Sequence, residues 1–211
     1  MLLTVVDYGV GNLRSIAKSI EKANFDNNLN YSVKVSSDIN DVKKSDKIVL
    51  PGQGSFRACK EGINNIKGLQ EELNESVLVK KKPIYGICAG MQLFATTGHE
   101  EEKTEGLNWI PGEVIKLNLG SSKFKVPHMG WNELKVENVS NVFKDTINKN
   151  HAYFIHSYEF IPLDKKTISI TTDYGKDVIA AVSSGNIFGS QFHPEKSQNT
   201  GITILANFLN L

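Results

Sequence analysis

The residues around position 88 carry the strongest chemical signal in the chain, a cysteine with a glycine two positions away on either side, in Gly86-Ile87-Cys88-Ala89-Gly90. An apolar run that favours a strand leads into Cys88, and a helix-forming segment begins at Gly90. Such a sharp strand-to-helix turn is a nucleophile elbow, which holds its central residue in a strained conformation. Free N–H groups at a helix start favour a thiolate. The pattern predicts Cys88 as a nucleophile; a buried structural cysteine beside two turn glycines is the alternative.

A second pair of reactive side chains, His193 and Glu195, follows the last expected strand and is separated by one proline. Proline keeps the preceding residue extended, and side chains at i and i+2 of an extended segment project to the same side. The imidazole can then face a thiol while the carboxylate fixes its tautomer, as in a catalytic triad. Alone, this spacing is more typical of a surface pair. Together with the glycine-flanked cysteine it predicts a Cys-His-Glu triad.

A third segment, Pro51-Gly52-Gln53-Gly54, is either a glycine turn that opens a helix or a source of backbone donors for an oxyanion. In the second interpretation, Gly52 and Gln53 present one N–H group. Ala89 presents the other, because the residue after an elbow nucleophile points its amide at the developing negative charge.

The elements that must position these residues alternate between strand and helix patterns in the first half of the chain. We expect strands at residues 2–6, 31–35, 47–50 and 83–87, and helices at 12–23, 55–66, 69–79 and from residue 90. This alternation predicts an α/β fold, an open and mostly parallel sheet with helices on both faces. Ligands bind at the carboxyl ends of such strands, where Cys88 and residues 51–54 both fall.

The second half is richer in strand patterns. We expect strands at residues 112–117, 133–136, 153–160, 167–172, 178–182 and 187–191, the last two joined as a hairpin, and a closing helix at 201–209. Repeats and flexible linkers are absent from the sequence, so residues 1–211 are expected to form a single domain.

Composition excludes several classes of function. The chain has 24 Lys and Arg against 23 Asp and Glu, so its near-neutral charge does not favour nucleic acid or an acidic membrane. An apolar run long enough for a transmembrane helix is missing, and the first residues are typical of a strand and not of a signal peptide. With only Cys59 and Cys88, a reduced cytoplasmic enzyme is favoured over a lone disulfide, and Cys59 is expected to pack inertly in a helix. The five histidines lack the spacing of a metal site.

Six blocks together resemble a known family. The elbow and Gln191-Phe192-His193-Pro194-Glu195 resemble the class I (triad) glutamine amidotransferases. More narrowly, the chain is similar to the glutaminase subunits of imidazole glycerol phosphate synthase, on the further blocks Asp7-Tyr8-Gly9-Val10-Gly11-Asn12-Leu13, Pro51-Gly52-Gln53-Gly54-Ser55-Phe56, Val126-Pro127-His128-Met129-Gly130-Trp131-Asn132 and Tyr153-Phe154-Ile155-His156-Ser157-Tyr158. The resemblance extends from residue 7 to residue 197, nearly the whole chain.

This resemblance implies the class I glutamine amidotransferase fold and the hydrolysis of glutamine to glutamate and ammonia through a thioester on Cys88, with His193 as acid and base and Glu195 as its orienting partner. It implies no cofactor. By family position the substrate is bound by Gly54, Gln92, Glu100, Ser157 and Tyr158. Gln92 as an exposed helix residue, and Glu100 as part of the solvated run at 100–102, are the alternatives.

The family also implies a partner, a (β/α)₈ cyclase subunit that forms a heterodimer with this chain, receives ammonia through a channel and makes imidazole glycerol phosphate and AICAR in histidine biosynthesis. Family position places Asn12, Trp131, Tyr153 and Lys196 near that partner. Trp131 as a core aromatic and Lys196 as a solvated cation are equally open. Neither nucleic acid nor a membrane is expected as a partner.

The chain departs from the family at two positions that matter. Gln53 stands where relatives commonly carry valine, and Ala89 replaces a common leucine; both would contribute backbone amides, so the chemistry should survive. Three rival functions remain at this point: a paralogous glutaminase that feeds ammonia to a nucleotide-linked sugar in surface-polysaccharide synthesis, a cysteine peptidase-like thiol hydrolase, and a silent binding module, which the intact triad disfavours.

Overall fold

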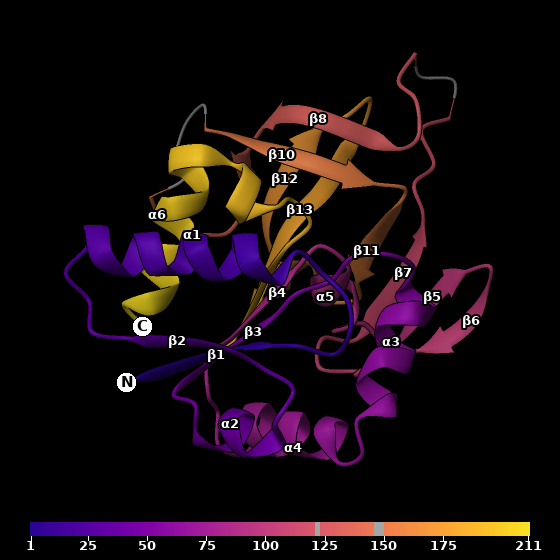
Figure 1. Ribbon diagram of the computed structural model, residues 1–211. Helices are drawn as coiled ribbons and strands as arrows, with labels where there is room; N and C mark the ends of the chain where they lie inside the picture. The colour runs from indigo at the N-terminus through magenta and orange to yellow at the C-terminus, as the bar shows by residue number, and fades with distance from the viewer. Residues whose placement is uncertain (121–122, 146–149) are drawn as a thin grey trace.

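A computed structural model describes residues 1–120, 123–145 and 150–211, and an eight-stranded sheet runs through its centre (Figure 1). The strand order is β2-β1-β3-β4-β14-β13-β12-β9; the first five are parallel to their neighbours, and β13, β12 and β9 continue the sheet in antiparallel pairings. The mostly parallel α/β sheet predicted from the sequence is confirmed. The bounds are β1 Leu2–Val6, β2 Ser32–Ser36, β3 Lys47–Leu50, β4 Ile84–Ile87, β9 Lys135–Val136, β12 Ile168–Asp173, β13 Asp177–Ser184 and β14 Ile187–Ser190.

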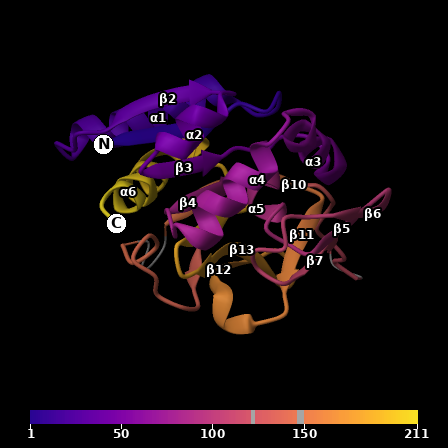
Figure 2. The ribbon, with the colours of Figure 1, turned by 90° about the horizontal axis from the view of Figure 1, so that it is seen from below.

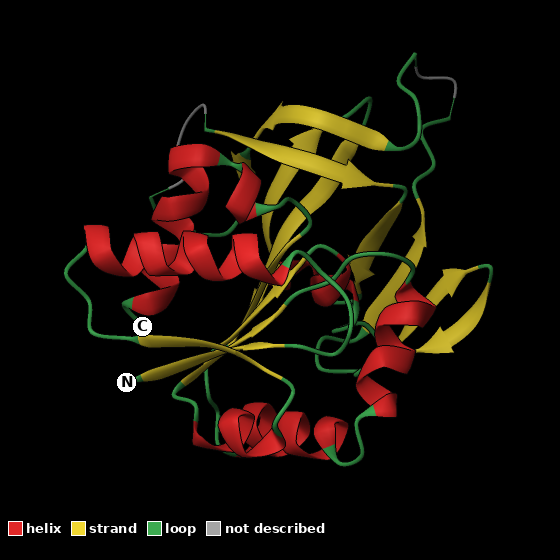
Figure 3. Ribbon diagram, in the orientation of Figure 1, coloured by secondary structure: helices red, strands yellow, loops and turns green. Residues whose placement is uncertain are grey.

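Helices cover both faces of this sheet (Figures 1 and 3). Helices α1 (Leu13–Asp26) and α6 (Gln198–Leu209) lie on one face, and α2 (Ile39–Lys44), α3 (Phe56–Asn65) and α4 (Leu69–Asn74) lie on the other, where α2 and α4 stand in front of the sheet when it is seen from below (Figure 2). Strand β3 shows how the sheet divides the core, because Val49 packs with α1 and α6 while Ile48 and Leu50 pack with α3 and α4. Burial on both faces explains why residues 48–50 are all apolar.

Helix α1 illustrates how local sequence sets an element. The Asn12 side chain accepts a hydrogen bond from the Ser15 amide at 3.4 Å, which caps the first turn. The buried side chains recur at helical spacing and face the sheet and α6: Ile16, Ala17, Ile20 and Ala23.

The second half forms two smaller sheets, and here one predicted strand is wrong. The chain does not continue as one strand through residues 153–160 but breaks at Ser157. Strand β10 (His151–His156) pairs with β8 (His128–Glu133), whereas β11 (Tyr158–Pro162) joins β7 (Gly112–Lys116), β5 (Thr97–Glu100) and β6 (Glu102–Glu105). The Ser157 carbonyl accepts the Leu117 amide at 2.9 Å at this junction. The junction places Ser157 where two sheets meet.

Three other expected elements differ from the prediction, and two elements were not expected. The expected strand at 133–136 divides at Leu134, a buried residue whose amide bonds to the carbonyl of Asn150. The expected helix at 69–79 is α4 followed by a π-helical turn, Glu75–Val79, and the helix after the elbow, α5 (Ala89–Gln92), is a single turn. Helix α2 and the β5–β6 hairpin were not predicted. Among the described residues, no helix is long and apolar enough to span a bilayer.

Candidate active site

Cys88 sits at the carboxyl end of β4 in the strained conformation expected of an elbow, with φ 54° and ψ −115°. Its amide donates to the Ser190 carbonyl on the neighbouring strand at 2.7 Å, which fixes the turn from one side. Gly90 fixes it from the other, because a Cβ there would lie 2.1 Å from the Leu50 carbonyl oxygen. Since α5 has only four residues, its dipole is weaker than the sequence suggested, and side chains must set the state of the sulfur.

The sulfur faces a cavity of about 340 Å³, a volume that suits a ligand of amino-acid size. Most of the residues singled out from the sequence line it: Gln53, Gly54, Cys88, Ala89, Gln92, Glu100, Ser157, Tyr158, His193 and Lys196. Pro127, Ile155 and His156 also line it and were not assigned a role, although all three lie in sequence blocks already noted. Gly52 and Glu195 lie behind the lining, and Asn12, Trp131 and Tyr153 are outside it.

His193 and Glu195 form a buried ion pair beside Cys88. His193 Nδ1 lies 2.7 Å from Glu195 Oε1, and the Glu195 side chain is 1 % exposed. Burial alone would lower the pKa of His193, but the Cys88 sulfur and the Glu195 carboxylate stabilise the imidazolium and raise that pKa to about 10. His193 is therefore an imidazolium at neutral pH, and its charge lies beside the sulfur of Cys88.

His193 is extended, as predicted for the residue before proline, but the backbone that follows it is not. Pro194–Lys196 is a 3-10 turn, and the amide of Lys196 donates to the His193 carbonyl at 3.0 Å. Proline accounts for this, because it is also favoured at the first position of a helical turn. The turn brings the Glu195 carboxylate back toward the His193 imidazole. The predicted contact between the two side chains is therefore present, although the backbone between them is helical and not extended.

The turn at residues 51–54 packs directly against the elbow. A Cβ on Gly52 would lie 2.0 Å from the Gly90 amide nitrogen, so only glycine fits. The Tyr8 hydroxyl donates to the Pro51 carbonyl, and the Cys59 thiol donates to the Gln53 carbonyl at 3.7 Å. Two carbonyl groups of the turn, those of Pro51 and Gln53, are therefore already hydrogen-bonded.

Glu100 is placed on the cavity and not in a solvated run. Its Oε2 accepts the amide of Phe56, the first residue of α3, at 2.7 Å. Glu101 turns the β5–β6 hairpin with φ 60°, and Glu102 points away to pair with Arg57. The three neighbouring carboxylates thus have three different environments, and only the first lines the cavity.

A row of amide side chains forms another wall of the cavity. Gln92 Nε2 donates to the Tyr158 carbonyl at 3.0 Å and to Gln191 Oε1 at 2.9 Å, and Gln191 Nε2 lies 3.5 Å from Cys88 Sγ. Gln92 is 5 % exposed, so it is not the exposed helix residue that the sequence left open. Sequence reasoning assigned no role to Gln191, although it lies two positions before His193 at the end of β14.

Two further histidines continue this wall into the protein. His156 Nδ1 donates to the Tyr158 carbonyl at 2.9 Å, His128 Nδ1 donates to His156 Nε2 at 3.0 Å, and Asn132 Nδ2 donates to His128 Nε2 at 3.3 Å. Burial lowers the pKa of His156 to about 4, with a smaller contribution from His193, and burial together with His156 lowers the pKa of His128 to about 3. Both imidazoles are neutral at pH 7, in contrast to His193.

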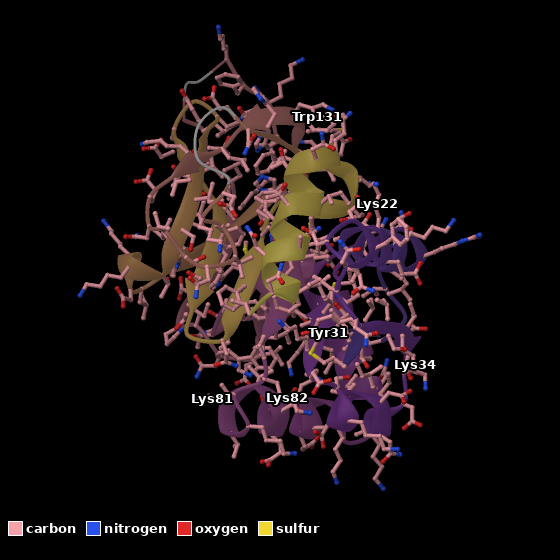
Figure 4. The ribbon with its side chains drawn as sticks, turned by 90° about the vertical axis from the view of Figure 1, so that its left-hand side faces the viewer. Lys22, Tyr31, Lys34, Lys81, Lys82 and Trp131 are labelled. Atoms are coloured by element: carbon pink, nitrogen blue, oxygen red, sulfur yellow. The ribbon has the colours of Figure 1, made fainter. Side chains whose placement is uncertain are left out.

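An exposed apolar face adjoins the cavity on the outer side of the β8–β10 ribbon. Trp131 is opposite Tyr153 and Met129 is opposite Ile155 in the register, and Trp131 is 49 % and Met129 62 % exposed. The Lys196 ammonium lies 5.6 Å from the centre of the Tyr153 ring. Figure 4 shows Trp131 at the outer edge of the molecule, at the opposite end from Lys81 and Lys82. Trp131 is therefore not a core aromatic.

Asn12 is exposed at the start of α1. The loop before it lies against the turn at residues 51–54, because a Cβ on Gly11 would be 3.0 Å from Cβ of Pro51. Within residues 1–120, 123–145 and 150–211, no cluster of three or more His, Cys, Asp or Glu side chains is arranged to hold a metal ion, and both cysteines are free.

Comparison with known proteins gives a consistent result. A family model described as glutamine amidotransferase class-I matches residues 4–211. The chain is 50 % identical to the imidazole glycerol phosphate synthase subunit HisH of Pelagibacter ubique over the full length of both, and 41 % identical to that of Brucella suis, with 99 % of this chain and 98 % of the relative covered.

Among solved structures, the fold is similar to a glutamine amidotransferase with a TM-score of 0.73 at 15 % identity, with 99 % of each chain covered. It is also similar to a glutamine amidotransferase from Thermotoga maritima, with a TM-score of 0.64 at 16 % identity, covering 92 % of this chain and 76 % of that one. At these identities the likeness supports the fold alone, and it agrees with the sheet and helix arrangement described above.

Proposed function

The chain belongs to the class-I glutamine amidotransferase family, and on that premise we propose that it hydrolyses glutamine to glutamate and ammonia with Cys88, His193 and Glu195 as its triad. The observation that carries the proposal is the buried His193–Glu195 ion pair that shares one cavity with the strained Cys88. Such a pair keeps a thiol ionised and a proton donor beside it, which is what the two halves of the reaction require.

In the first half, the Cys88 thiolate attacks the carboxamide carbon of glutamine and the carbonyl oxygen becomes an oxyanion. The amides of Ala89 and of the Gly52–Gln53 turn are the proposed donors to that oxygen, because both segments meet at the elbow. His193 gives its proton to the amide nitrogen, the carbon–nitrogen bond breaks, and ammonia leaves behind a thioester.

In the second half, water attacks the thioester carbonyl while the now neutral His193 removes one of its protons. The carbon–sulfur bond breaks, glutamate is released, and the thiolate–imidazolium pair is restored. Glu195 keeps Nδ1 of His193 as the hydrogen-bonded nitrogen throughout, which leaves Nε2 to transfer protons.

Substrate selection is assigned to the polar groups around the cavity, Gly54, Gln92, Glu100, Ser157 and Tyr158. Glu100 uses one carboxylate oxygen to bind the Phe56 amide, and its negative charge is suited to the α-ammonium of the substrate. Gln92 commits its Nε2 to Tyr158 and Gln191, so it can meet the substrate only as an acceptor through Oε1.

The partner is proposed to be the (β/α)₈ cyclase subunit of imidazole glycerol phosphate synthase, which uses the ammonia to make imidazole glycerol phosphate and AICAR in histidine biosynthesis. Support comes from the name of the Pelagibacter relative and from the exposed face formed by Met129, Trp131, Tyr153 and Ile155. Apolar patches of this kind mark protein interfaces. Asn12 and Lys196 are assigned to the rim of the same interface.

A covered interface also has a chemical purpose. Ammonia is protonated in bulk water at neutral pH and loses its nucleophilicity, so efficient transfer requires a path closed to solvent. The cavity and the aromatic face adjoin at Lys196, which lines the first and contacts Tyr153 on the second. The continuous family match over residues 4–211 supports treating residues 1–211 as one domain.

The deciding experiment is ammonia release from glutamine, measured for the isolated chain and for the chain with its cyclase partner. We expect weak release alone and a large increase with the partner and its nucleotide substrate present. Thiol-dependent cleavage of peptides without ammonia release would overturn the proposal in favour of a thiol hydrolase. If ammonia is released but the co-purifying partner uses a nucleotide-linked sugar, the chemistry stands and the histidine pathway is excluded.

A further inference from the structure

Gln191 is fully buried at the end of β14, and its side chain bridges Gln92 and the nucleophile. Oε1 accepts from Gln92 Nε2 at 2.9 Å, and Nε2 lies 3.5 Å from Cys88 Sγ. The backbone of Gln191 is fixed as well, because its amide donates to the Ala180 carbonyl at 2.8 Å. A rigidly held amide group aimed at the reactive sulfur is an arrangement that the mechanism above does not use.

The orientation of the Gln191 side-chain amide is set by a chain of hydrogen bonds that starts at the Tyr158 carbonyl. A backbone carbonyl can only accept hydrogen bonds, so Gln92 must present its NH₂ group to it, as His156 presents Nδ1–H. The second hydrogen of Gln92 Nε2 then points at Gln191, which must accept this hydrogen bond through Oε1. The remaining end of Gln191, its NH₂ group, is thereby directed at Cys88.

An N–H group directed at sulfur distinguishes between a thiol and a thiolate. Hydrogen bonds to an ionised acceptor are about twice as strong as those to a neutral one. Gln191 is out of contact with solvent, so water does not compete for this bond. Gln191 also keeps its proton throughout the reaction, unlike His193, and so continues to stabilise the sulfur when the thioester breaks and the thiolate is expelled.

We propose that Gln191 is a positioning residue of the glutaminase reaction, which holds the Cys88 sulfur as a thiolate through its side-chain N–H and is itself oriented by Gln92 and the Tyr158 carbonyl. This inference rests on the proposed function for its role in turnover. Its action on the sulfur is independent of any substrate.

The test is the pH dependence of the rate at which iodoacetamide alkylates Cys88 in the full chain, followed by mass spectrometry of the Cys88 peptide. For Gln191→Leu, we expect the midpoint of this profile to rise by about one pH unit, because a hydrogen bond to a charged group is lost. For Gln191→Glu, which keeps the oxygen that accepts from Gln92 but places a second oxygen against the sulfur, we expect a larger rise.

The control is Thr172→Val, which removes another buried hydrogen bond, from Thr172 Oγ1 to the Glu133 carbonyl. Thr172 is in β12, which is separated from β4 by two other strands of the sheet. It is expected to leave the alkylation midpoint unchanged. An unchanged midpoint in both Gln191 variants, or an equal shift in the control, would overturn the inference. Gln191→Met, which is neutral and has no N–H to donate, replaces Gln191→Leu if that variant does not fold.

A second measurement, kcat for glutamine as a function of pH, tests whether the hydrogen bond from Gln191 to the sulfur affects catalysis. With the partner bound, Gln191→Leu should lower kcat for glutamine about tenfold at pH 7 and recover as the pH rises, with KM little changed. A pH-independent loss, or a loss confined to KM, would contradict a role on the thiolate. A shifted alkylation profile in a chain that releases no ammonia would instead overturn the proposed function, while the action of Gln191 on the sulfur would stand.

Discussion

The two cysteines of this chain occupy regions that resemble each other in burial and differ in what points at the sulfur. Cys59, in α3, is completely buried and its thiol donates to the Gln53 carbonyl; burial raises its pKa to about 11. Cys88 is 9 % exposed, receives the N–H of Gln191, and lies beside the imidazole of His193. Burial without a neighbouring cation keeps Cys59 as a thiol, whereas a donor or a cation beside a sulfur favours its ionisation.

The backbone conformations at Cys59 and Cys88 also differ. Cys59 has an ordinary helical hydrogen bond to the Ser55 carbonyl at 3.0 Å, while Cys88 is held in the positive-φ region by the strands and turns packed around it. Strain of this kind persists only where the surroundings enforce it. Burial therefore does not distinguish a reactive cysteine from an inert one; the charges and donors around it do.

Replacing Cys88 by alanine is the change expected to have the largest effect. Cys88→Ala should abolish glutamine hydrolysis, because Cys88 carries the only thiol among the described cavity residues. With the partner bound, cyclase activity supplied with external ammonia should remain. The two activities are measured side by side on one preparation, and the loss of both would count against ammonia transfer between subunits.

Removing the negative charge of Glu195 tests whether the imidazolium of His193 accounts for the reactivity of Cys88. Glu195→Gln should lower the pKa of His193 from about 10 and reduce kcat by about 100-fold or more, because the imidazolium loses its buried counter-charge. The measurement is kcat for glutamine across pH 6–9 together with the Cys88 alkylation profile. An unchanged alkylation profile would show that Glu195 does not act through the imidazole.

The neutral histidines behind the cavity give a prediction for stability in acid. The folded pKa of His156, about 4, lies below its ordinary value of 6.5, so between these values the unfolded chain binds protons that the folded chain does not. The free energy of unfolding should therefore fall as the pH is lowered from 7 to 4.5, by about 2 kcal/mol from this residue.

Urea unfolding of the parent chain and of His156→Asn at both pH values measures this contribution, because carboxylate titrations common to the two proteins cancel. The variant should show the smaller decrease. An equal decrease in both proteins would mean that His156 is not the group that destabilises the fold in acid.

The smallest effect is expected for the second cysteine. Cys59→Ala should leave kcat within about twofold and reduce the free energy of unfolding by about 1 kcal/mol, the scale of removing one buried atom group from a packed core. In the folded parent chain, iodoacetamide should modify Cys88 and spare Cys59, with both modified in denaturant. Rapid alkylation of Cys59 in the folded chain would remove the contrast on which this comparison depends.

The sequence predicted those features whose signals are local. The buried strands at β1, β3 and β4 are short apolar runs closed by turn residues, and their common carboxyl edge followed from the βαβ alternation. This was enough to place Cys88 and residues 51–54 side by side, because an elbow and a glycine turn each have a recognisable sequence.

Features that depend on partners distant in the sequence were missed. Aromatic and apolar residues continue from β10 into β11 without an intervening glycine, proline or asparagine, so none of these turn residues marks the break at Ser157, where the pairing strand changes from β8 to β7. Gln191 was overlooked for a similar reason, since its role depends on Gln92, which lies 99 positions earlier. The β5–β6 hairpin turns at Glu101, and no sequence signal marks it because Glu101 lies within a run of three glutamates and not beside a turn residue.

The contact between Gly52 and Gly90 has a consequence for which substitutions the site tolerates. A Cβ on Gly52 would lie 2.0 Å from the Gly90 amide nitrogen, and a Cβ on Gly90 would lie 2.1 Å from the Leu50 carbonyl oxygen. Even alanine at either position would therefore force residues 51–54 away from the nucleophile. Such a variant would retain every side chain of the triad and still misplace the backbone amides of the turn.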